Sequence, residues 1–305
     1  MPDLRRWPAL AVALLAVLLA APAGSAPVKL MDWPDLLGRP LPAASERITY
    51  GPGALQVADL WLPEGKGPFP VVLIVHGGCW LSGVAKLGIM NYAAEDLRRR
   101  GIAVWNIEYR GVDRTGGGYP GTFQDVAAAA DKLAEIAPAH HLDTGHIVAL
   151  GHSAGGHLAL WLAARARLPA SSPLHAAHPL PIAAVVSTGG LPDLAAERAR
   201  GDDGCGADTI DRLVGPTTAA HSNVYADTSP AELGVGRDHE VLINGVEDPI
   251  APPDGADAYA AKMKAKGADI RAITLADTGH VELISPGSVA WSRTVEVVDA
   301  LLHSR

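Results

Sequence analysis

The chain has 305 residues, of which 48% are hydrophobic, and it carries a formal net charge of −8 at pH 7. This acidic balance, without a basic run, argues against nucleic acid or an anionic lipid surface as a partner. Aromatic residues make up only 5% of the chain, and two cysteines cannot staple a fold of this size. A large carbohydrate-stacking surface and a disulfide-rich scaffold are therefore both disfavoured.

The first 25 residues have the three parts of a secretory signal peptide. Arg5 and Arg6 give a positive start, residues 9–21 form an uninterrupted apolar run, and small residues follow at 21–26. A membrane anchor is the alternative, but the run is shorter than the ~20 residues that a spanning helix needs. We therefore predict a cleaved signal (1–25), a secreted or periplasmic protein, and no membrane contact after cleavage.

Residues 26–305 are predicted to form a single α/β domain, because strand and helix patterns alternate along most of this stretch. After a hairpin-like start, continuous apolar runs such as 70–75 predict strands buried on both faces. The alternation implies a mostly parallel central sheet covered by helices on both faces. The predicted strands are 46–50, 54–62, 70–75, 102–107, 146–150, 182–187, 239–244 and 269–274. The predicted helices are 85–100, 122–137, 154–167, 254–266 and 288–303.

Two segments lack this periodicity. Residues 27–45 are rich in proline and are predicted to be irregular. Residues 191–232 are rich in Gly, Asp, Thr and Pro, and we interpret them as a cap or lid inserted over the C-terminal edge of the sheet. At the start of the helix predicted at 122–137, Thr122 and Asp125 have the spacing of a capping box.

The strongest chemical signal is the sequence GHSAGG at residues 151–156. A G-x-S-x-G between a strand and a helix is a nucleophile elbow, whose turn is so tight that small residues must flank the serine. The turn lifts Oγ of Ser153 out of the sheet and points a helix N-terminus at the site, which favours developing negative charge. A glycine-rich turn without chemistry is the alternative, and the strand and helix context favours Ser153 as a nucleophile.

A second motif, HGGCW at residues 76–80, follows the buried strand 70–75. Acyl transfer builds negative charge on a carbonyl oxygen, and fixed backbone N–H groups must meet that charge. One such donor follows the nucleophile and another lies in the loop after the third strand. We therefore predict that Gly78, Cys79 and Ala154 are the donors of an oxyanion hole.

Two further residues of this motif have predicted roles. Trp80 is expected to contact the substrate. His76 could be a metal ligand or a base, but we interpret it as a structural residue that holds the loop.

The partners of Ser153 should follow it in the order acid, then histidine. Asp248 lies in the turn after the strand 239–244 and is our choice over its neighbour Glu247, because the Asp-Pro turn suits the site. His280 follows the strand 269–274, whereas the other late histidine, His303, lies at the C-terminus. A histidine there can take the serine proton and return it to the leaving group.

Other features of the sequence are weaker or negative. A disulfide between Cys79 and Cys205 is as consistent with the sequence as two free thiols. No G-x-x-x-x-G-K-[ST] motif for phosphates and no H-E-x-x-H motif for zinc occurs, so we predict neither a metal nor a cofactor.

These motifs resemble α/β-hydrolase esterases akin to kynurenine formamidase and the hormone-sensitive-lipase-like carboxylesterases. The resemblance covers about residues 46–303. It depends on HGGCW at 76–80, NIEYR at 106–110, GHSAGGHLAL at 151–160, EDP at 247–249 and TGHVELI at 278–284. It implies a triad of Ser153, Asp248 and His280, with Gly78, Cys79 and Ala154 around the oxyanion.

The predicted function is that of a carboxylesterase that cleaves a small or medium acyl ester through an acyl-enzyme on Ser153. An arylformamidase, which acts on a formyl amide, and a peptidase of the prolyl-oligopeptidase type are the enzymatic alternatives. A catalytically silent module that binds a small molecule is the non-enzymatic alternative. The natural substrate and the oligomeric state stay open.

Overall fold

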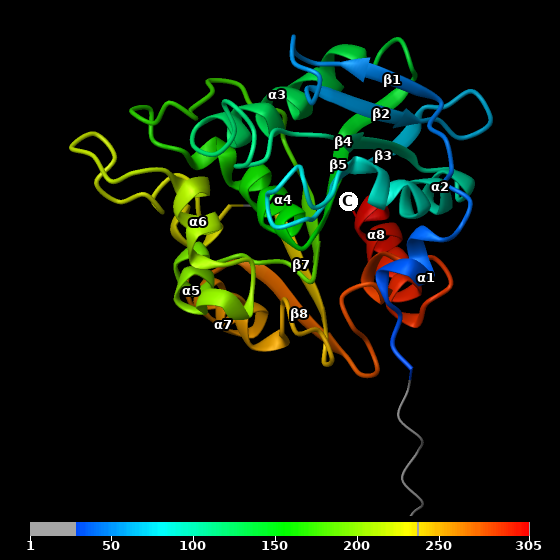
Figure 1. Cartoon of the computed structure of the whole chain (residues 1–305). Helices are drawn as coiled ribbons and strands as arrows, with labels where there is room; N and C mark the ends of the chain where they lie inside the picture. The colour runs from blue at the N-terminus through cyan, green and yellow to red at the C-terminus, as the bar shows by residue number, and fades with distance from the viewer. Residues whose placement is uncertain (1–28, 237, 305) are drawn as a thin grey trace, which may run out of the picture.

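A computed structural model describes residues 29–236 and 238–304, so the predicted signal peptide lies outside the described residues. The centre of the fold is one eight-stranded sheet with the order β1-β2-β4-β3-β5-β6-β7-β8 (Figure 1). The strands are β1 (Glu46–Thr49), β2 (Val57–Trp61), β3 (Phe69–Val75), β4 (Ala103–Ile107), β5 (Leu142–His152), β6 (Ala184–Thr188), β7 (His239–Gly245) and β8 (Asp269–Leu275). The two pairings of β2, with β1 and with β4, are antiparallel, and all the others are parallel. The predicted α/β-hydrolase architecture is confirmed.

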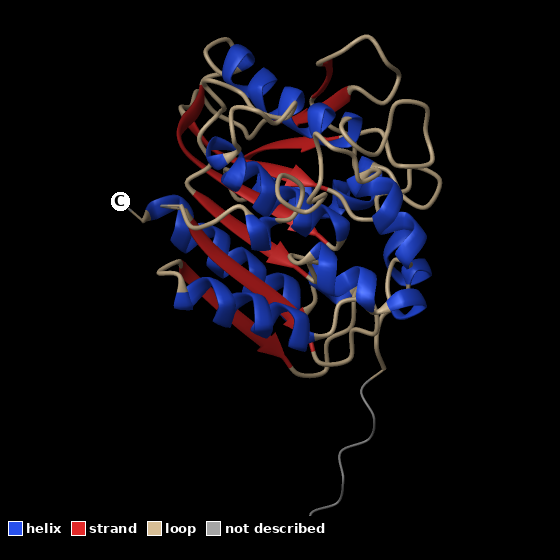
Figure 2. Ribbon diagram, turned by 90° about the vertical axis from the view of Figure 1, so that its left-hand side faces the viewer, coloured by secondary structure: helices blue, strands red, loops and turns tan. Residues whose placement is uncertain are grey.

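Helices cover both faces of the sheet (Figure 2). They are α1 (Trp33–Leu37), α2 (Asn91–Arg99), α3 (Gly121–Ile136), α4 (Ala154–Ala164), α5 (Leu194–Ala199), α6 (Ala207–Val214), α7 (Pro253–Ala265) and α8 (Val289–His303). Residues of α3–α7 share one hydrophobic cluster with the sheet, and residues of α1, α2 and α8 share a second.

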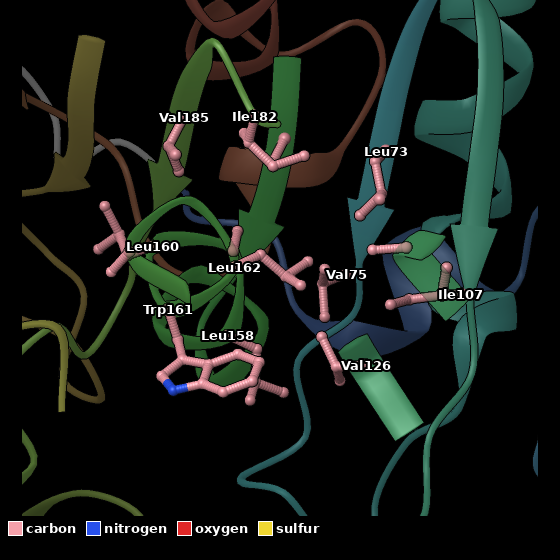
Figure 3. Packing of buried hydrophobic residues seen from close by; sticks show 14 of the residues in the cluster. Leu73, Val75, Ile107, Val126, Leu158, Leu160, Trp161, Leu162, Ile182 and Val185 are labelled. Atoms are coloured by element: carbon pink, nitrogen blue, oxygen red, sulfur yellow. The ribbon is translucent and has the colours of Figure 1, made fainter. Parts of the chain in front are cut away.

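The central strand β3 explains why two cores form. Its alternate residues Leu73 and Val75 face the cluster of α3 and α4, whereas Val72 and Ile74 face the cluster of α2 and α8. All four are fully buried, as expected for a parallel strand covered on both sides. Figure 3 shows Val75 beside Val126, which comes from α3 on the first side, with Leu73 farther along β3.

The structure corrects two local predictions. The proline-rich stretch 27–45 contains a helix, α1, which a reciprocal capping box between Asp32 and Asp35 begins. Helix α3, by contrast, has no capping box, because Thr122 Oγ1 donates to Arg110 O and the Asp125 carboxylate accepts from the Arg110 guanidinium. The spacing was right for a cap, but both side chains bind a neighbouring loop instead.

Glu240 on β7 supplies a pH-dependent test of the fold. Burial and the nearby Asp238 raise its pKa to about 8, although Tyr259 donates a hydrogen bond to it at 3.0 Å. Between pH ~4.5 and 8 the native state therefore holds a proton that the unfolded state has released, so the free energy of unfolding falls as pH rises through this window.

Glu240→Gln keeps the shape of the side chain and removes the titration. We expect its Tm at pH 8 to exceed that of the wild type by about 2 °C or more, with little difference at pH 4. Thermal unfolding at pH 4, 6 and 8 measures this, with the exposed Glu64→Gln as the control. A lower Tm for Glu240→Gln at pH 8 would show that the ionised carboxylate stabilises the fold.

Candidate active site

Ser153 lies between β5 and α4, in the turn that the elbow motif predicts. Its backbone is in an uncommon region, with φ 55° and ψ −125°, and its N–H donates to Thr188 O at 2.9 Å. The side chain is 2% exposed and lies at the N-terminus of α4. The helix dipole and the free N–H groups of the first turn therefore face the space next to Oγ.

The flanking glycines are required by close backbone contacts. A Cβ on Gly151 would lie 2.1 Å from Gly155 O, and one on Gly155 would lie 2.1 Å from Val75 O. No side chain can relieve these overlaps, because each involves the backbone of a central strand or helix. The elbow therefore tolerates only glycine at both positions.

His280 and Asp248 form a buried pair in the loops after β8 and β7. The distance between His280 Nδ1 and Asp248 Oδ2 is 2.6 Å, and Asp248 Oδ1 accepts from the N–H groups of Ile250 and Ala251. Burial opposes ionisation of Asp248, but these hydrogen bonds outweigh it and keep the pKa of Asp248 below its usual value. Glu247, the alternative acid, is exposed, and among the described residues it forms no hydrogen bond or ion pair with His280.

Gly189, which the sequence analysis did not single out, makes room for this pair. It has φ 53°, and a Cβ on it would lie 3.1 Å from both Asp248 Oδ2 and His280 Nδ1. Gly189 directly follows β6, at the same edge of the sheet as the elbow, and this position in the sequence could have identified it as a residue of the site.

The loop after β3 surrounds the site from the other side. Gly78, Cys79 and Trp80 all have positive φ, at 110°, 51° and 53°. The backbone N–H groups of Gly78, Cys79 and Ala154 donate to no backbone carbonyl of the described residues. Within the described residues, these three predicted oxyanion donors are therefore not occupied by a backbone acceptor.

His76 and Trp80 support this loop from inside the protein. The His76 ring lies 2.8 Å from Glu108 Oε1 and stacks on Tyr109. Trp80 is fully buried, and its Nε1 donates to His157 Nδ1 at 3.2 Å. Trp80, which the sequence predicts to contact substrate, is not among the residues that line the cavity beside Ser153, and its indole packs in the hydrophobic core.

The structure joins Cys79 to Cys205, the pairing that the sequence left open. The bridge spans 126 residues of sequence and links the loop after β3 to the segment between α5 and α6.

A cavity of about 230 Å³ lies beside Ser153. Besides Ser153, His280, His152, Gly78 and Cys79, it is lined by Trp33, Leu37, Val84, Ala85, Ile89 and Ile250. Trp33 and Leu37 belong to α1, so the helix that the sequence analysis missed forms a wall of the site. None of the lining residues belongs to 191–232, the segment predicted as a cap.

Two contacts hold α1 and its neighbourhood against the histidine loop. The Trp33 ring lies edge-on to the rings of His152 and His280, each with 6.3 Å between ring centroids. The buried Glu282 carboxylate accepts hydrogen bonds from the N–H groups of Met31 and Gly279.

His152, which also lines the cavity, is uncharged. Burial lowers the pKa of His152 to about 3, so its ring is neutral at physiological pH. Its Nε2 lies 3.1 Å from His280 O.

Within residues 29–236 and 238–304, no group of three or more His, Cys, Asp or Glu side chains could hold a metal ion. No helix in the same ranges is both long enough and apolar enough to span a bilayer.

Known proteins share this architecture. The BD-FAE family profile matches residues 58–263. A rice protein described as a probable isoprenylcysteine alpha-carbonyl methylesterase, ICME, is 34% identical over 117 residues, which are 37% of this chain and 26% of that protein. The chain thus spans about a quarter of the length of the curated relatives it matches.

Solved structures agree with the fold over nearly the whole chain. Esterase B from Lactobacillus rhamnosis superposes with a TM-score of 0.69 at 20% identity, covering 86% of this chain and 88% of that one. The propionate-bound esterase 2 of Thermogutta terrifontis superposes with a TM-score of 0.67 at 21% identity, covering 87% and 96%. The profile match covers more than half of the chain, and the chain therefore belongs to the BD-FAE family.

Proposed function

We propose that this protein is a carboxylesterase that cleaves small or medium acyl esters through a covalent acyl-enzyme on Ser153. The observation that carries the proposal is the shared cavity of Ser153 and His280, with His280 hydrogen-bonded to an ionised Asp248. Nucleophile, base and orienting acid are the three roles that acyl transfer requires.

Acylation would begin with attack of Ser153 Oγ on the ester carbonyl carbon. Asp248 accepts the hydrogen bond from His280 Nδ1, which leaves Nε2 free to take the serine proton. The N–H groups of Gly78, Cys79 and Ala154 would stabilise the negative oxygen of the tetrahedral intermediate. The bond to the alcohol then breaks, and His280 gives the proton to the leaving oxygen.

Deacylation repeats these steps with water. His280 takes a proton from the water as its oxygen attacks the acyl carbon, and the bond to Ser153 Oγ breaks as the proton returns to serine. The products are a carboxylic acid and the free enzyme. The atoms and electrons of the hydrolysis therefore balance without a metal or a redox cofactor.

The cavity favours an uncharged substrate of limited size. Among the described residues that line it, none is Lys, Arg, Asp or Glu, and its volume of about 230 Å³ suits a small or medium acyl group. A formyl amide requires the same catalytic groups, so arylformamidase activity stays the nearest alternative.

Active-site labelling tests this proposal. A fluorophosphonate should label the purified wild type and fail to label Ser153→Ala, as the phosphonylation of Thermogutta terrifontis esterase 2 by sarin illustrates for a protein of this fold. A panel of acyl esters and a formyl anilide then separates the two activities. A folded wild type that neither labels nor hydrolyses any of them would favour the silent binding module.

Trp33 is expected to control the fit of the acyl group. Trp33→Ala removes an aromatic wall of the cavity, and we expect KM for a butyrate ester to rise about tenfold with a smaller change in kcat. Trp33→Phe should keep most of the affinity. A Trp33→Ala enzyme with unchanged KM for every chain length would mean that α1 does not contact the bound substrate.

Export is part of the same proposal. The predicted signal peptide and the Cys79–Cys205 bridge both suit an oxidising compartment. N-terminal sequencing of secreted or periplasmic protein should find a first residue near position 26, and uncleaved cytoplasmic protein would contradict export.

A further inference from the structure

One short segment of the region predicted as a cap contacts the loops on both sides of the active site. This segment, residues 194–206, consists of α5 and the turn that follows it. Cys205 at its end is bonded to Cys79 in the oxyanion loop, and Arg200 near its middle binds the turn that contains Asp248. It contributes no residue to the described lining of the cavity, so covering the substrate does not explain these contacts.

Arg200 is connected to His280 by hydrogen bonds that pass through the turn containing Asp248. Arg200 Nη1 donates to Ile250 O at 2.8 Å, and Ile250 N donates to Asp248 Oδ1 at 2.9 Å. The other oxygen of Asp248 lies 2.6 Å from His280 Nδ1. Hydrogen bonds on the two backbone groups of Ile250 therefore link the guanidinium through Asp248 to His280, and Ile250 also lines the cavity.

Arg200 is itself held in place within the segment. Its Nη2 donates to Asp203 O at 2.9 Å, and its Nη1 pairs with Glu197 at 3.2 Å. A guanidinium fixed on two sides presents its remaining N–H group in one direction, which is the property needed to position a loop.

The contact of Cys205 reaches the oxyanion donors. Cys79 has φ 51°, a region that a residue with a side chain occupies only when its surroundings hold it there. Its N–H group is one of the three predicted oxyanion donors and has no backbone acceptor among the described residues, and Cys79 lines the same cavity as Ser153. The bridge fixes the side chain of this residue to the segment, and so limits how far the donor can turn away from the oxyanion position.

We propose that residues 194–206 are a brace. In this brace, Arg200 and Cys205 are positioning residues that fix the turn containing Asp248 and the loop containing Cys79 relative to each other. This inference rests on the proposed esterase function. The brace acts on the alignment of transition-state groups, so its loss should lower kcat and leave KM nearly unchanged. Removing an oxyanion donor costs ~10²–10³ in kcat, and loosening one should cost less, about tenfold.

The experiment compares kcat and KM for a short acyl ester in the oxidised wild type and in wild type reduced with tris(2-carboxyethyl)phosphine. The same assay is applied to Cys205→Ala with and without the phosphine, to Arg200→Gln, Arg200→Lys and Arg198→Gln, and to the double variant Arg200→Gln/Cys205→Ala. The phosphine is oxidised to its oxide as the bridge becomes two thiols, and water supplies the oxygen of the oxide and the two thiol protons. Arg198 is the matched control, because it belongs to the same segment but pairs with the exposed Asp211. Circular dichroism and Tm establish that each sample is folded at the assay temperature.

We expect kcat to fall about tenfold in the reduced wild type, in Cys205→Ala and in Arg200→Gln, with KM within threefold of the oxidised enzyme. Arg198→Gln should match the wild type, the phosphine should not change Cys205→Ala, and Arg200→Lys should recover part of the lost kcat. The double variant Arg200→Gln/Cys205→Ala should lose less than the product of the single losses, because either change releases the same segment.

A folded, reduced wild type with kcat within twofold of the oxidised enzyme would overturn the brace, and so would equal losses in Arg198→Gln and Arg200→Gln. If Cys205→Ala does not fold, reduction of the already folded wild type still decides the question. Failure of the proposed function looks different: the oxidised wild type would then neither label at Ser153 nor hydrolyse any ester.

Discussion

Replacing Ser153 by alanine should lower kcat for ester hydrolysis by about a millionfold, the loss typical of a triad nucleophile. The change removes the atom that attacks the acyl carbon, and no other hydroxyl group lines the described cavity. Stability should change little, because Ser153 Oγ makes no hydrogen bond among the described contacts. Steady-state kinetics and single-turnover assays for a released alcohol measure the effect, with Tm as the check on folding.

The exposed Ser171→Ala is a suitable control and should keep wild-type kcat. A Ser153→Ala protein that retained more than about a hundredth of wild-type turnover would reject Ser153 as the nucleophile. The activity would then require a second reactive centre elsewhere in the chain.

The second large effect is expected at Asp248. Asp248→Asn keeps the size of the side chain, but an amide does not stabilise the His280 imidazolium and allows the wrong tautomer of the ring. A change of this kind lowers kcat by about 10⁴-fold in related chemistry. The same kinetic assay as for Ser153 measures it, and Tm should fall slightly because Ile250 and Ala251 also donate to this carboxylate.

The neighbouring Glu247→Gln is the matched control. Its side chain is exposed, so kcat should stay within about twofold of the wild type. If Glu247→Gln were the more damaging change, the acid turn would have to rearrange when substrate binds, and the hydrogen bond between Asp248 and His280 would not describe the working enzyme.

Local patterns in the sequence were sufficient to predict the sheet and the elbow. Each predicted strand overlaps a strand of the structure, because runs such as 70–75 need burial on two faces and few other structures provide it. Helix α1 was missed because it has five residues and lies among prolines, so its hydrophobic periodicity is too short to detect. The consequence was functional, since Trp33 lines the cavity.

Contacts between distant loops were harder to predict than the loops themselves. The pairing of Cys79 with Cys205 depends on where the 194–206 segment lies, and nothing in either local sequence specifies that position. The same holds for Gly189, whose importance comes from the Asp248–His280 pair packed against it. Trp80 follows Gly78 and Cys79 in the sequence, which suggested a substrate contact, but its indole packs in the core, where Nε1 donates to His157.

The contact of the Met31 N–H with Glu282 has a consequence for how the protein acquires its activity. Trp33 comes from the beginning of the described chain and His280 from its last part, and both line one cavity. Such contacts close long loops, so the chain must lose conformational entropy before the contacts can stabilise the fold. A chain that has assembled only the strands up to β5 therefore contains Ser153 but no complete cavity, and the proposed activity requires α1 and the loop of His280 to have packed beside it.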